Sequence, residues 1–497
     1  MLAVRRAGFR LSTLKSPWWS FRRLRKTDVG KRWLEQNRKL SPSRNCSAKA
    51  TGTDTSTSTH VPHRKRKEKN VSPPLNAAFF KVDGAIPPSH TPPSQGEESS
   101  GGWVVGEVTD HAIDLHDVRP GEAIDVPYEL TINPSFRDFW QSVFYSHDRL
   151  NTSTPFARKL GFQDQVLPFS LMLFLTGSMS HADSATVQVG FQNAIYHWPA
   201  FAGDTITKRF VIRSVRVASS NKYSIFSFHC ELKNQRGQVI FTAEKSMIFP
   251  VVLPASNVTF PVAVPPRLLE EHLVSRADSL HALGSQSLQS LRPGQLLLHS
   301  LARPLSPAQV RGGWEGGKEG GKEGGEEGKE KTGTGTGESM QLSSLGRLTH
   351  ERHFNTRKFK RDEMYIPGGL VLGLTLSASA RDLHEVLHEE VIECAFINHL
   401  HPWDIVSSFS YIKEMDENIT GDLEALTLRT IGVKNVDVHL DLLDQAFPLA
   451  LFTTPSLRTK HMEALCKAHI PELSKKIVCV VERRILRQSP KTEAFLL

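Results

Sequence analysis

Two groups of residues in the sequence have the side chains needed for acid–base chemistry. His147 and Asp148 are adjacent, and His353 has the carboxylates Glu351 and Asp362 within nine positions of it. A histidine can act as a general base near neutral pH without special burial, because its ordinary pKa is already close to neutrality. His353, and His147 with Asp148, are therefore residues whose side chains could transfer protons. Each could instead be an ordinary residue of a surface loop.

Two glycines open an apolar segment that should be a helix. Gly368 and Gly369 precede a run of leucine, valine and small residues. Backbone N–H groups at a helix start have no partner within the helix, and they stabilise negative charge that develops on an oxygen. Glycine at such a position permits close backbone approach, so Gly369 could supply an oxyanion-binding amide. A glycine that only serves packing at the helix start is the alternative.

A loose internal repeat organises the chain. The turn at 119–122 (RPGE) recurs at 292–295 (RPGQ), an offset of 173. The pairs Pro168 and Pro367, and Asp204 and Asp404, follow with offsets of 199 and 200. The two aspartates are expected to position the backbone at a strand start and to have no catalytic role.

The difference between these offsets has a visible cause. Residues 311–339 are a Gly/Glu/Lys tract of 29 residues, a composition that cannot bury a core and is typical of disorder. Without it the later offsets become 170 and 171, close to 173. Three weak matches that share one spacing predict a duplicated unit.

Each repeat has the same order of predicted elements: a short strand, a polar helix, an apolar helix and long strands with β-branched residues or period-2 patterns. A helix that is apolar on most faces must be buried. One buried helix with several antiparallel strands predicts an α+β fold in which a sheet wraps around a helix. The predicted helices are 136–144, 168–180, 342–352 and 368–383, and the strands are 205–217, 224–232, 239–249, 405–412, 423–433 and 476–485.

The positive charge of the chain is concentrated at its start. Residues 1–72 hold 19 Lys and Arg against 4 Asp and Glu, whereas the remaining chain holds 42 against 48. The body is thus mildly acidic, which argues against a nucleic-acid-binding surface. An Arg-rich start without acids before Asp28 is typical of a mitochondrial or plastid transit peptide, with a disordered basic tail as the alternative. We predict a leader and disordered linker over 1–100.

The cysteines argue against a secreted protein, and the apolar runs argue against a membrane-spanning one. Cys46, Cys230, Cys394, Cys466 and Cys479 form no CxxC pair and no metal-ligand spacing, so we expect reduced thiols, no metal and a protein that is not secreted. The longest apolar run, at 167–175, is too short to cross a bilayer.

Several segments together resemble the MaoC-like hydratases, and within these the double-hot-dog mesaconyl-CoA hydratases. They are 153–157 (STPFA) with Leu160-Gly161, 199–206 (PAFAGDTI), 353–355 (HFN), Gly368-Gly369 and the strand 477–486. The likeness covers roughly 103–250 and 285–488 and implies a double hot-dog. It also implies reversible addition of water to the double bond of an enoyl-CoA without a cofactor, CoA itself being part of the substrate.

The family's pair of catalytic residues is incomplete here. The resemblance places an Asp and a His five residues apart in one hot-dog, to position and deprotonate water. The first repeat has Ser146 and Asn151 at these positions, and the second has Leu348 and His353. His353 therefore falls on the position of the catalytic histidine, while the acid is missing.

Coenzyme A needs cations for its phosphates. Arg357 and Lys358, just after His353, are the substrate-binding candidates together with Gly368 and Gly369. Other candidates are Lys208, Arg209, Arg213, Lys360 and Arg361. Most such charge runs are only solvated surface.

The resulting hypothesis is a mitochondrial (or plastid) acyl-CoA hydratase or dehydratase, with hot-dogs at 103–250 and 285–488 joined by a linker at 251–284 and with a possible homodimer. A catalytically silent acyl-thioester-binding hot-dog and a hot-dog thioesterase are the alternatives.

Deleting the 311–339 tract should leave the melting temperature of the protein essentially unchanged, because a segment made mainly of glycine, glutamate and lysine cannot bury a core on folding. Differential scanning calorimetry of the deleted and full chains measures this. A large drop would mean that the tract packs against the body, and the repeat spacing would lose its explanation.

Overall fold

The computed structural model describes residues 118–179, 185–250, 259–283, 290–305, 337–355, 357–420 and 422–490. All of them belong to one compact unit, Ser72–Leu497. The predicted leader and linker at 1–100, Cys46 and residues 311–336 of the Gly/Glu/Lys tract lie outside the described residues. None of the described helices has the length and apolar composition of a membrane span.

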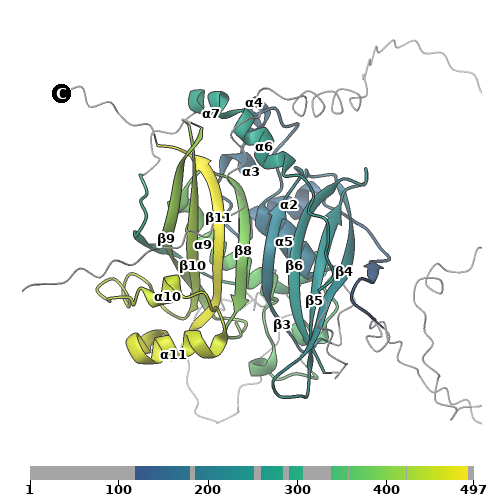
Figure 1. The fold of residues 1–497 in the computed structure, drawn as a ribbon, viewed down its shortest axis with the longest axis vertical. Coiled ribbons are helices and arrows are strands. Elements are labelled where there is room, and N and C mark those ends of the chain that lie inside the picture. Colours follow the sequence, from purple (N-terminus) through teal and green to yellow (C-terminus); the bar gives the residue numbers. More distant parts are fainter. Residues whose placement is uncertain are drawn as a thin grey trace, which may run out of the picture. The chain divides into compact units, whose positions relative to one another are not determined.

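The described strands form one continuous antiparallel sheet in which two halves repeat the same topology (Figure 1). The strand order is β1-β4-β5-β6-β3 in the first half and, continuing across the seam, β8-β11-β10-β9-β7 in the second. The first half has β3 at the seam and β1 at the outer edge, and the second half has β8 at the seam and β7 at the outer edge. The repeat predicted from sequence is therefore confirmed as a structural repeat.

The first half consists of a five-stranded sheet with its helices, and β2 adds a short pair to β4. Its elements are β1 (Ala123–Asp125), β2 (Leu130–Thr131), α2 (Pro134–Val143), α3 (Arg149–Thr152), α4 (Thr154–Lys159), α5 (Phe169–Gly177), β3 (Val187–Tyr196), β4 (Thr205–Val217), β5 (Ser224–Lys233) and β6 (Val239–Phe249). The predicted strands at 205–217, 224–232 and 239–249 agree with β4, β5 and β6. Strand β3 was not predicted, because its sequence has no clear alternation of apolar and polar residues.

The second half repeats this order and adds helices. Its elements are β7 (Leu296–Pro304), α8 (Glu338–Leu345), η3 (Glu351–His353), η4 (Arg361–Glu363), α9 (Gly368–Leu383), β8 (Val386–Phe396), β9 (Ile405–Thr420), β10 (Leu423–Lys434), α10 (Ala450–Thr453), α11 (Thr459–His469), η5 (Pro471–Leu473) and β11 (Ile477–Gln488). Helix α9 has the bounds that were predicted. The predicted helix at 342–352 is wrong at its end, because α8 stops at Leu345, and β9 continues beyond the predicted 412.

The two halves begin their longest strands with the same turn. Asp204 Oδ2 accepts from the Phe201 backbone N–H at 2.8 Å, and Asp404 Oδ2 accepts from that of His401 at 2.9 Å. The other oxygen of each aspartate accepts from a side-chain amide across the turn, Gln235 in the first half and its counterpart Asn435 in the second. The prediction that these aspartates position backbone at a strand start is confirmed.

Helices α5 and α9 are the two apolar helices of the predicted pattern, and each is buried against its own half of the sheet. In α5 the described side chains from Leu171 to Thr176 are all buried. In α9 the buried run extends from Gly369 to Ser379. The two helices contact one another across the seam, so each half encloses one helix and the helices meet at the centre.

The seam itself is the pairing of β3 with β8, with Gly190 opposite Ala395. The backbones approach so closely at Gly190 that a Cβ there would lie 1.9 Å from the Cys394 carbonyl oxygen. Glycine is therefore required at this point of the strand. The Cys394 and Cys479 thiols lie 3.6 Å apart next to it and are free, as are Cys230 and Cys466.

Two expectations about linking segments need correction. The linker predicted at 251–284 contains α6 (Leu268–Ser275) and α7 (Ala277–Ala282), because Leu269, Leu273 and Leu280 supply an apolar face that is buried. Helix α8 begins at Glu338, so the last two residues of the tract predicted to be disordered at 311–339 are helical. A deletion of the tract should end at 336.

Replacing Gly190 with alanine should destabilise the protein by about 1–3 kcal/mol or more, the usual cost of forcing an extra methyl group into packed structure. Urea denaturation of Gly190→Ala measures this, and Gln192→Ala on the same strand, an exposed position, serves as the control. Equal stability of Gly190→Ala and the unmodified protein would show that the seam does not have the close approach described.

Candidate functional site

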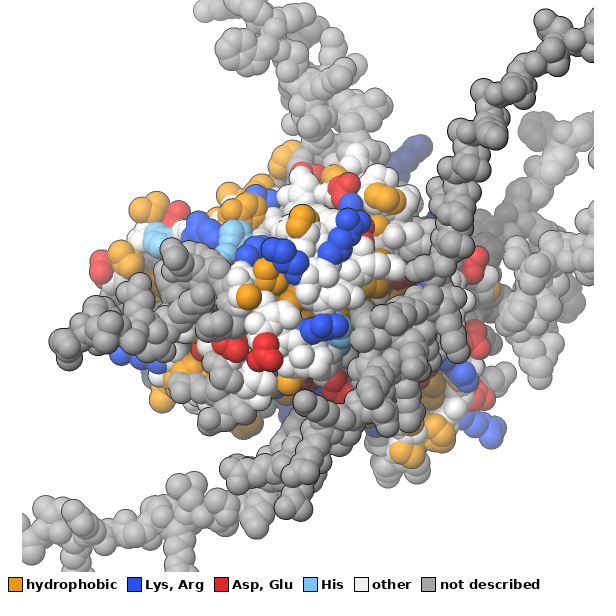
Figure 2. Space-filling model, turned by 90° about the horizontal axis from the view of Figure 1, so that it is seen from above, with side chains coloured by type: hydrophobic (Ala, Val, Ile, Leu, Met, Phe, Trp, Pro, Cys, Tyr) orange, Lys and Arg blue, Asp and Glu red, His pale blue; other side chains and the backbone are white. Residues whose placement is uncertain are grey.

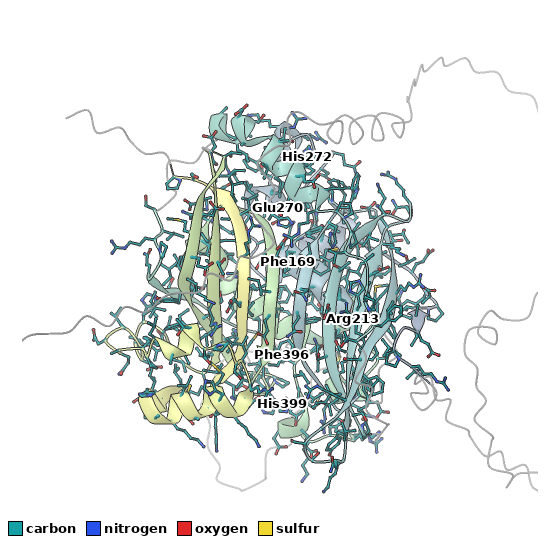
Figure 3. The ribbon with its side chains drawn as sticks, in the orientation of Figure 1. Phe169, Arg213, Glu270, His272, Phe396 and His399 are labelled. Carbon is teal, nitrogen blue, oxygen red and sulfur yellow. The ribbon has the colours of Figure 1, made fainter. Side chains whose placement is uncertain are left out.

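The larger described cavity, cavity 1, lies between the two halves and has a volume of about 160 Å³. The second half contributes the start of α9, the loop at 348–353 and the residues after β8. The first half contributes the end of α5 and parts of β3 and β6. Phe396 and His399, which line it, lie toward the opposite end of the seam from Glu270 and His272 in Figure 3.

His353 lines cavity 1, as expected of a catalytic base. It closes the 3₁₀ turn η3, and its Nδ1 lies 2.8 Å from the Tyr365 carbonyl oxygen. The pKa of His353 is lowered to about 4, chiefly by burial; the Tyr365 carbonyl opposes this, and the nearby His350 and Arg352 add to the lowering. The ring is therefore neutral near pH 7. Because a carbonyl can only accept, Nδ1 carries the hydrogen and Nε2 has the free lone pair that a base needs.

The start of α9 lies in the same cavity. Pro367 caps the helix, and its carbonyl accepts from the N–H groups of Leu370 and Val371, which leaves those of Gly368 and Gly369 at the helix start. Both glycines line cavity 1. They also serve packing, because a Cβ on Gly368 would meet Phe396 at 2.9 Å and one on Gly369 would meet Phe174 at 3.0 Å. Both roles considered from the sequence are therefore compatible with the geometry.

No carboxylate among the described residues lines cavity 1. Leu348, at the position of the family's acid, lines it with an apolar side chain. Glu351 pairs with Lys358 instead, and neither it nor Asp362 lines the cavity. The hydrogen-bond partner of His353 is thus a backbone carbonyl, and neither of the two carboxylates considered from sequence replaces the missing acid.

The cations proposed for substrate binding do not line the cavity. Arg357 and Lys358 are exposed and lie outside its lining. Arg352 lines it instead, with its guanidinium 4.9 Å from the ring centroid of Tyr365. Arg352 was not among the substrate-binding candidates predicted from the sequence. Figure 2 shows charges of both signs among hydrophobic side chains on one described face, in keeping with a body that is not basic.

The cations proposed in the first half are engaged elsewhere. Lys208 is buried and donates to the carbonyls of Thr176 and Ser178 at 2.7 and 2.6 Å. Arg213 pairs with Glu244 at 3.3 Å, and Arg209 lies 3.8 Å from Asp125. None of the three lines cavity 1.

Four polar residues of the first half line cavity 1 and were missed from the sequence: Ser178, Thr186, Gln188 and Lys245. Lys245 is buried and its Nζ donates to the Gly177 carbonyl at 3.1 Å. Burial lowers the pKa of the Lys245 ammonium. Lys245 lies in β6 among the apolar residues of its buried face, and a lysine in such a place was the signal in the sequence that could have identified this part of the cavity.

A smaller cavity of about 80 Å³, cavity 2, occupies the equivalent place at the start of α5. Ser146 and Asn151, the first-half counterparts of Leu348 and His353, line it together with Asp148. Asn151 Nδ2 donates to the Val166 carbonyl at 2.8 Å. Cavity 2 therefore has the same framework as cavity 1 without a histidine at the base position.

His147 and Asp148, the second pair of catalytic candidates, lie in different surroundings in the structure. Asp148 is half-buried and lines cavity 2, and its Oδ1 accepts from the Val386 N–H of the other half at 2.7 Å. The pKa of Asp148 is raised to about 8, chiefly by burial; the hydrogen bond from the Val386 N–H opposes this rise, and the nearby Glu385 and Glu389 add to it. His147 lines neither cavity, and its ring lies 4.9 Å from that of His384. The two residues do not form an acid–base pair in the structure.

One cluster in the described residues has side chains that could hold a metal ion. Glu270, His388 and Glu390 have ligand atoms within 4.8 Å of one another. Two arginines already neutralise the carboxylates: Arg484 lies 2.7 Å from Glu270, and Arg267 pairs with both glutamates. The cluster is therefore an ion-pair network between α6 and the sheet.

Comparisons with known proteins agree with this fold. No family model and no curated protein matches the chain. Among solved structures, it is similar to a MaoC domain dehydratase of Chloroflexus aurantiacus, with 18% identity, a TM-score of 0.56 and coverage of 77% of this chain and 99% of that one.

Two further solved structures have lower TM-scores. A Mycobacterium tuberculosis protein described as a double hotdog has 16% identity, a TM-score of 0.47 and coverage of 75% of this chain and 97% of that one. A MaoC-like dehydratase of Phytophthora capsici has 10% identity, a TM-score of 0.35 and coverage of 64% and 90%. The chain is a double hot-dog, as its sequence predicted.

Replacing Asp148 with asparagine should stabilise the protein increasingly as the pH rises from about 4 to about 8. Between these pH values Asp148 of the unfolded chain releases its proton, because its pKa there is near the ordinary 3.8. Asp148 of the folded protein keeps its proton up to about pH 8. The unmodified protein therefore loses stability as the pH rises through this window. Asparagine cannot ionise and keeps the Oδ1 acceptor for Val386.

Urea denaturation at several pH values measures this difference, with Asp164→Asn as the control. The pKa of Asp164 is lowered in the folded protein, so its contribution to stability changes with pH only below this window. The stability difference between Asp164→Asn and the unmodified protein should therefore be constant across the window. A stability difference for Asp148→Asn that does not grow with pH would refute the buried protonated carboxyl.

Proposed function

We propose that this chain catalyses the addition of water to the double bond of an acyl thioester, and the reverse dehydration, in cavity 1. The observation that carries the proposal is the presence, in one cavity, of a neutral histidine with a free Nε2 lone pair and the amides of a helix start. Both belong to the second half. The similarity in fold to a dehydratase supports the class of reaction.

The residues of cavity 1 can perform the steps of hydration. The N–H groups of Gly368 and Gly369 hold the thioester carbonyl, where negative charge develops as water adds to the β-carbon. His353 Nε2 takes the proton from the attacking water, and the imidazolium then donates a proton to the α-carbon. The Tyr365 carbonyl fixes the ring and favours the imidazolium that forms between these steps.

The missing acid affects the rate that this site can reach. With Leu348 in place of a carboxylate, the attacking water has one side-chain partner fewer than in the family pattern. The substitution favours a slower hydratase, or the alternative function of a silent acyl-thioester-binding protein. A thioesterase is the third candidate, and cavity 1 has no described carboxylate that would act as its nucleophile or base.

We also propose a mesaconyl-type CoA thioester as substrate, the absence of a cofactor, assembly as a homodimer and a mitochondrial (or plastid) location, on the basis of the sequence resemblance and of the leader predicted at 1–100. Of the cations, Arg352 is better placed than Arg357 and Lys358 to contact a thioester in cavity 1.

His353→Gln should lower the rate of hydration by about 100-fold or more, the usual contribution of a proton-transfer group, because glutamine keeps the shape but cannot take the proton. Binding of a saturated acyl-CoA should survive, since the helix start is unchanged. Loss of absorbance at the enoyl-thioester band of crotonyl-CoA measures the rate. His147→Gln, outside both cavities, is the matched control and should retain the rate.

The outcomes separate the three functions. Full activity of His353→Gln would exclude His353 as the base. Acyl-CoA binding without any turnover by the unmodified protein would support the silent binder. Release of free thiol, detected with a thiol reagent, would support the thioesterase.

A further inference from the structure

We propose that His350 is a positioning residue, which holds the turn that carries His353 against the first half of the chain. The inference rests on the proposed function and adds to it a residue that acts through His353 and transfers no proton itself. His350 lies three positions before His353 and lines cavity 1 with it. The centroids of the two rings are 5.6 Å apart. His350 was not among the candidates predicted from the sequence.

Both ring nitrogens of His350 have a partner. Nδ1 accepts from the Arg352 backbone N–H at 3.2 Å, so the side chain caps the 3₁₀ turn η3 at its start. Nε2 lies 3.0 Å from the Ala185 carbonyl oxygen. Because a backbone N–H only donates and a carbonyl only accepts, the ring is neutral and its hydrogen is on Nε2.

The two neighbouring histidines are therefore opposite tautomers with different capacities. His353 has its hydrogen on Nδ1, which donates to the Tyr365 carbonyl, and its Nε2 lone pair is free. His350 has no free lone pair, because its Nδ1 is occupied by the Arg352 N–H. His353 is thus the base, and the bonds of His350 hold the turn. A proton on Nδ1 of His350 would remove the cap.

The partner of His350 in the first half is fixed by the sheet. Ala185 is buried, and the next residue, Thr186, donates its N–H to the backbone of β6 at 2.7 Å. A second bond nearby, from the Met179 N–H to the Gly346 carbonyl at 3.0 Å, joins the end of α8 to the residues after α5. The turn that carries the base is therefore anchored on the other half of the chain.

The turn η3 depends on such anchors because it is short. It contains three residues, Glu351–His353, and a 3₁₀ turn of this length has few hydrogen bonds of its own. A general base has to lie within about 2.6–3.2 Å of the proton that it takes. A displacement of about 1 Å can lower the rate about 100-fold. The cap and the bond to Ala185 are thus expected to contribute to kcat.

His350 also affects the protonation of His353. The pKa of His353 is lowered to about 4, chiefly by burial, and His350 adds to the lowering. Without the His350 ring, the turn is more open to water and one of the lowering influences is gone. The pKa of His353 should then rise toward its ordinary 6.5. The other titratable groups that line cavity 1 are Lys245 of β6, Arg352, Tyr365 and His399.

The test is the hydration of crotonyl-CoA by His350→Ala, followed at the enoyl-thioester band. We expect kcat to fall by about tenfold to 100-fold, the scale of a displaced catalytic group. KM and the affinity for butyryl-CoA should be nearly unchanged, since the start of α9 is intact. The acid limb of kcat/KM reports the base of the free enzyme, and it should move upward from near pH 4. A merely structural role would lower the melting temperature and leave this limb in place.

Conservative variants separate the two bonds of His350. His350→Asn keeps an acceptor for the Arg352 N–H, because asparagine is a good cap, but it is too short for Ala185. His350→Gln reaches Ala185 with an amide N–H but has no acceptor in the place of Nδ1. Each should retain more of kcat than His350→Ala. If His350→Ala does not fold, His350→Asn should show the same changes at smaller size.

Glu351→Gln is the matched control. Glu351 is on the same turn, exposed and outside the cavity lining, so this variant should retain both kcat and the acid limb. Full kcat of His350→Ala with an unmoved acid limb would overturn the inference. A loss confined to KM and to butyryl-CoA binding would make His350 a substrate contact, and the inference would also be wrong.

Absence of hydration by the unmodified protein would contradict the proposed function, and an NMR titration still tests the role of His350. His353→Gln identifies the ring signal of His353 by its disappearance. A pKa of His353 near 4 in the unmodified protein and a higher one in His350→Ala would support the inference. Equal values in the two proteins would refute it.

Discussion

The antiparallel pairing of β3 with β8 is the interaction on which the rest of this structure depends. It joins two five-stranded halves into one sheet and requires backbones so close that only glycine fits at position 190. Because this pairing places the two halves side by side, the end of α5 lies beside the start of α9 at cavity 1. At cavity 2 the start of α5 lies beside the end of α9. Each cavity is therefore built from both halves, and neither half alone contains a complete site.

Duplication has allowed the two cavities to diverge. Cavity 1 has a histidine at the base position, the open start of α9 and Lys245 from the first half. Cavity 2 has an asparagine at the base position and a carboxyl, Asp148, that accepts a hydrogen bond from the backbone of the other half. The chemistry proposed above therefore uses groups of the second half, while the first half supplies part of the lining of the same cavity.

The sequence predicted what local patterns determine. The bounds of α9, the strands β4 and β6 and the two aspartate turns followed from hydrophobic pattern and turn chemistry, and His353 followed from the family resemblance. Strand β3 could not be predicted, because it is specified by its pairing with distant β8. Helices α6 and α7 were missed for a similar reason, since their apolar faces are buried by residues far away in sequence.

The errors at the site have the same origin. Arg357 and Lys358 follow His353 in sequence, but the chain turns so that Arg352 lines the cavity and Lys358 pairs with Glu351. Lys245 is about a hundred residues before His353 and reaches the cavity only because the halves are paired. Sequence proximity is a poor guide to a site that is assembled across a seam.

The most direct test of the central claim is to follow the enoyl-thioester absorbance of the unmodified protein from both sides of the equilibrium. The account predicts that the band decays from crotonyl-CoA and grows from 3-hydroxybutyryl-CoA until both mixtures reach the same ratio. If neither mixture changes although both thioesters bind, cavity 1 is a binding site without hydratase activity, and the account is contradicted.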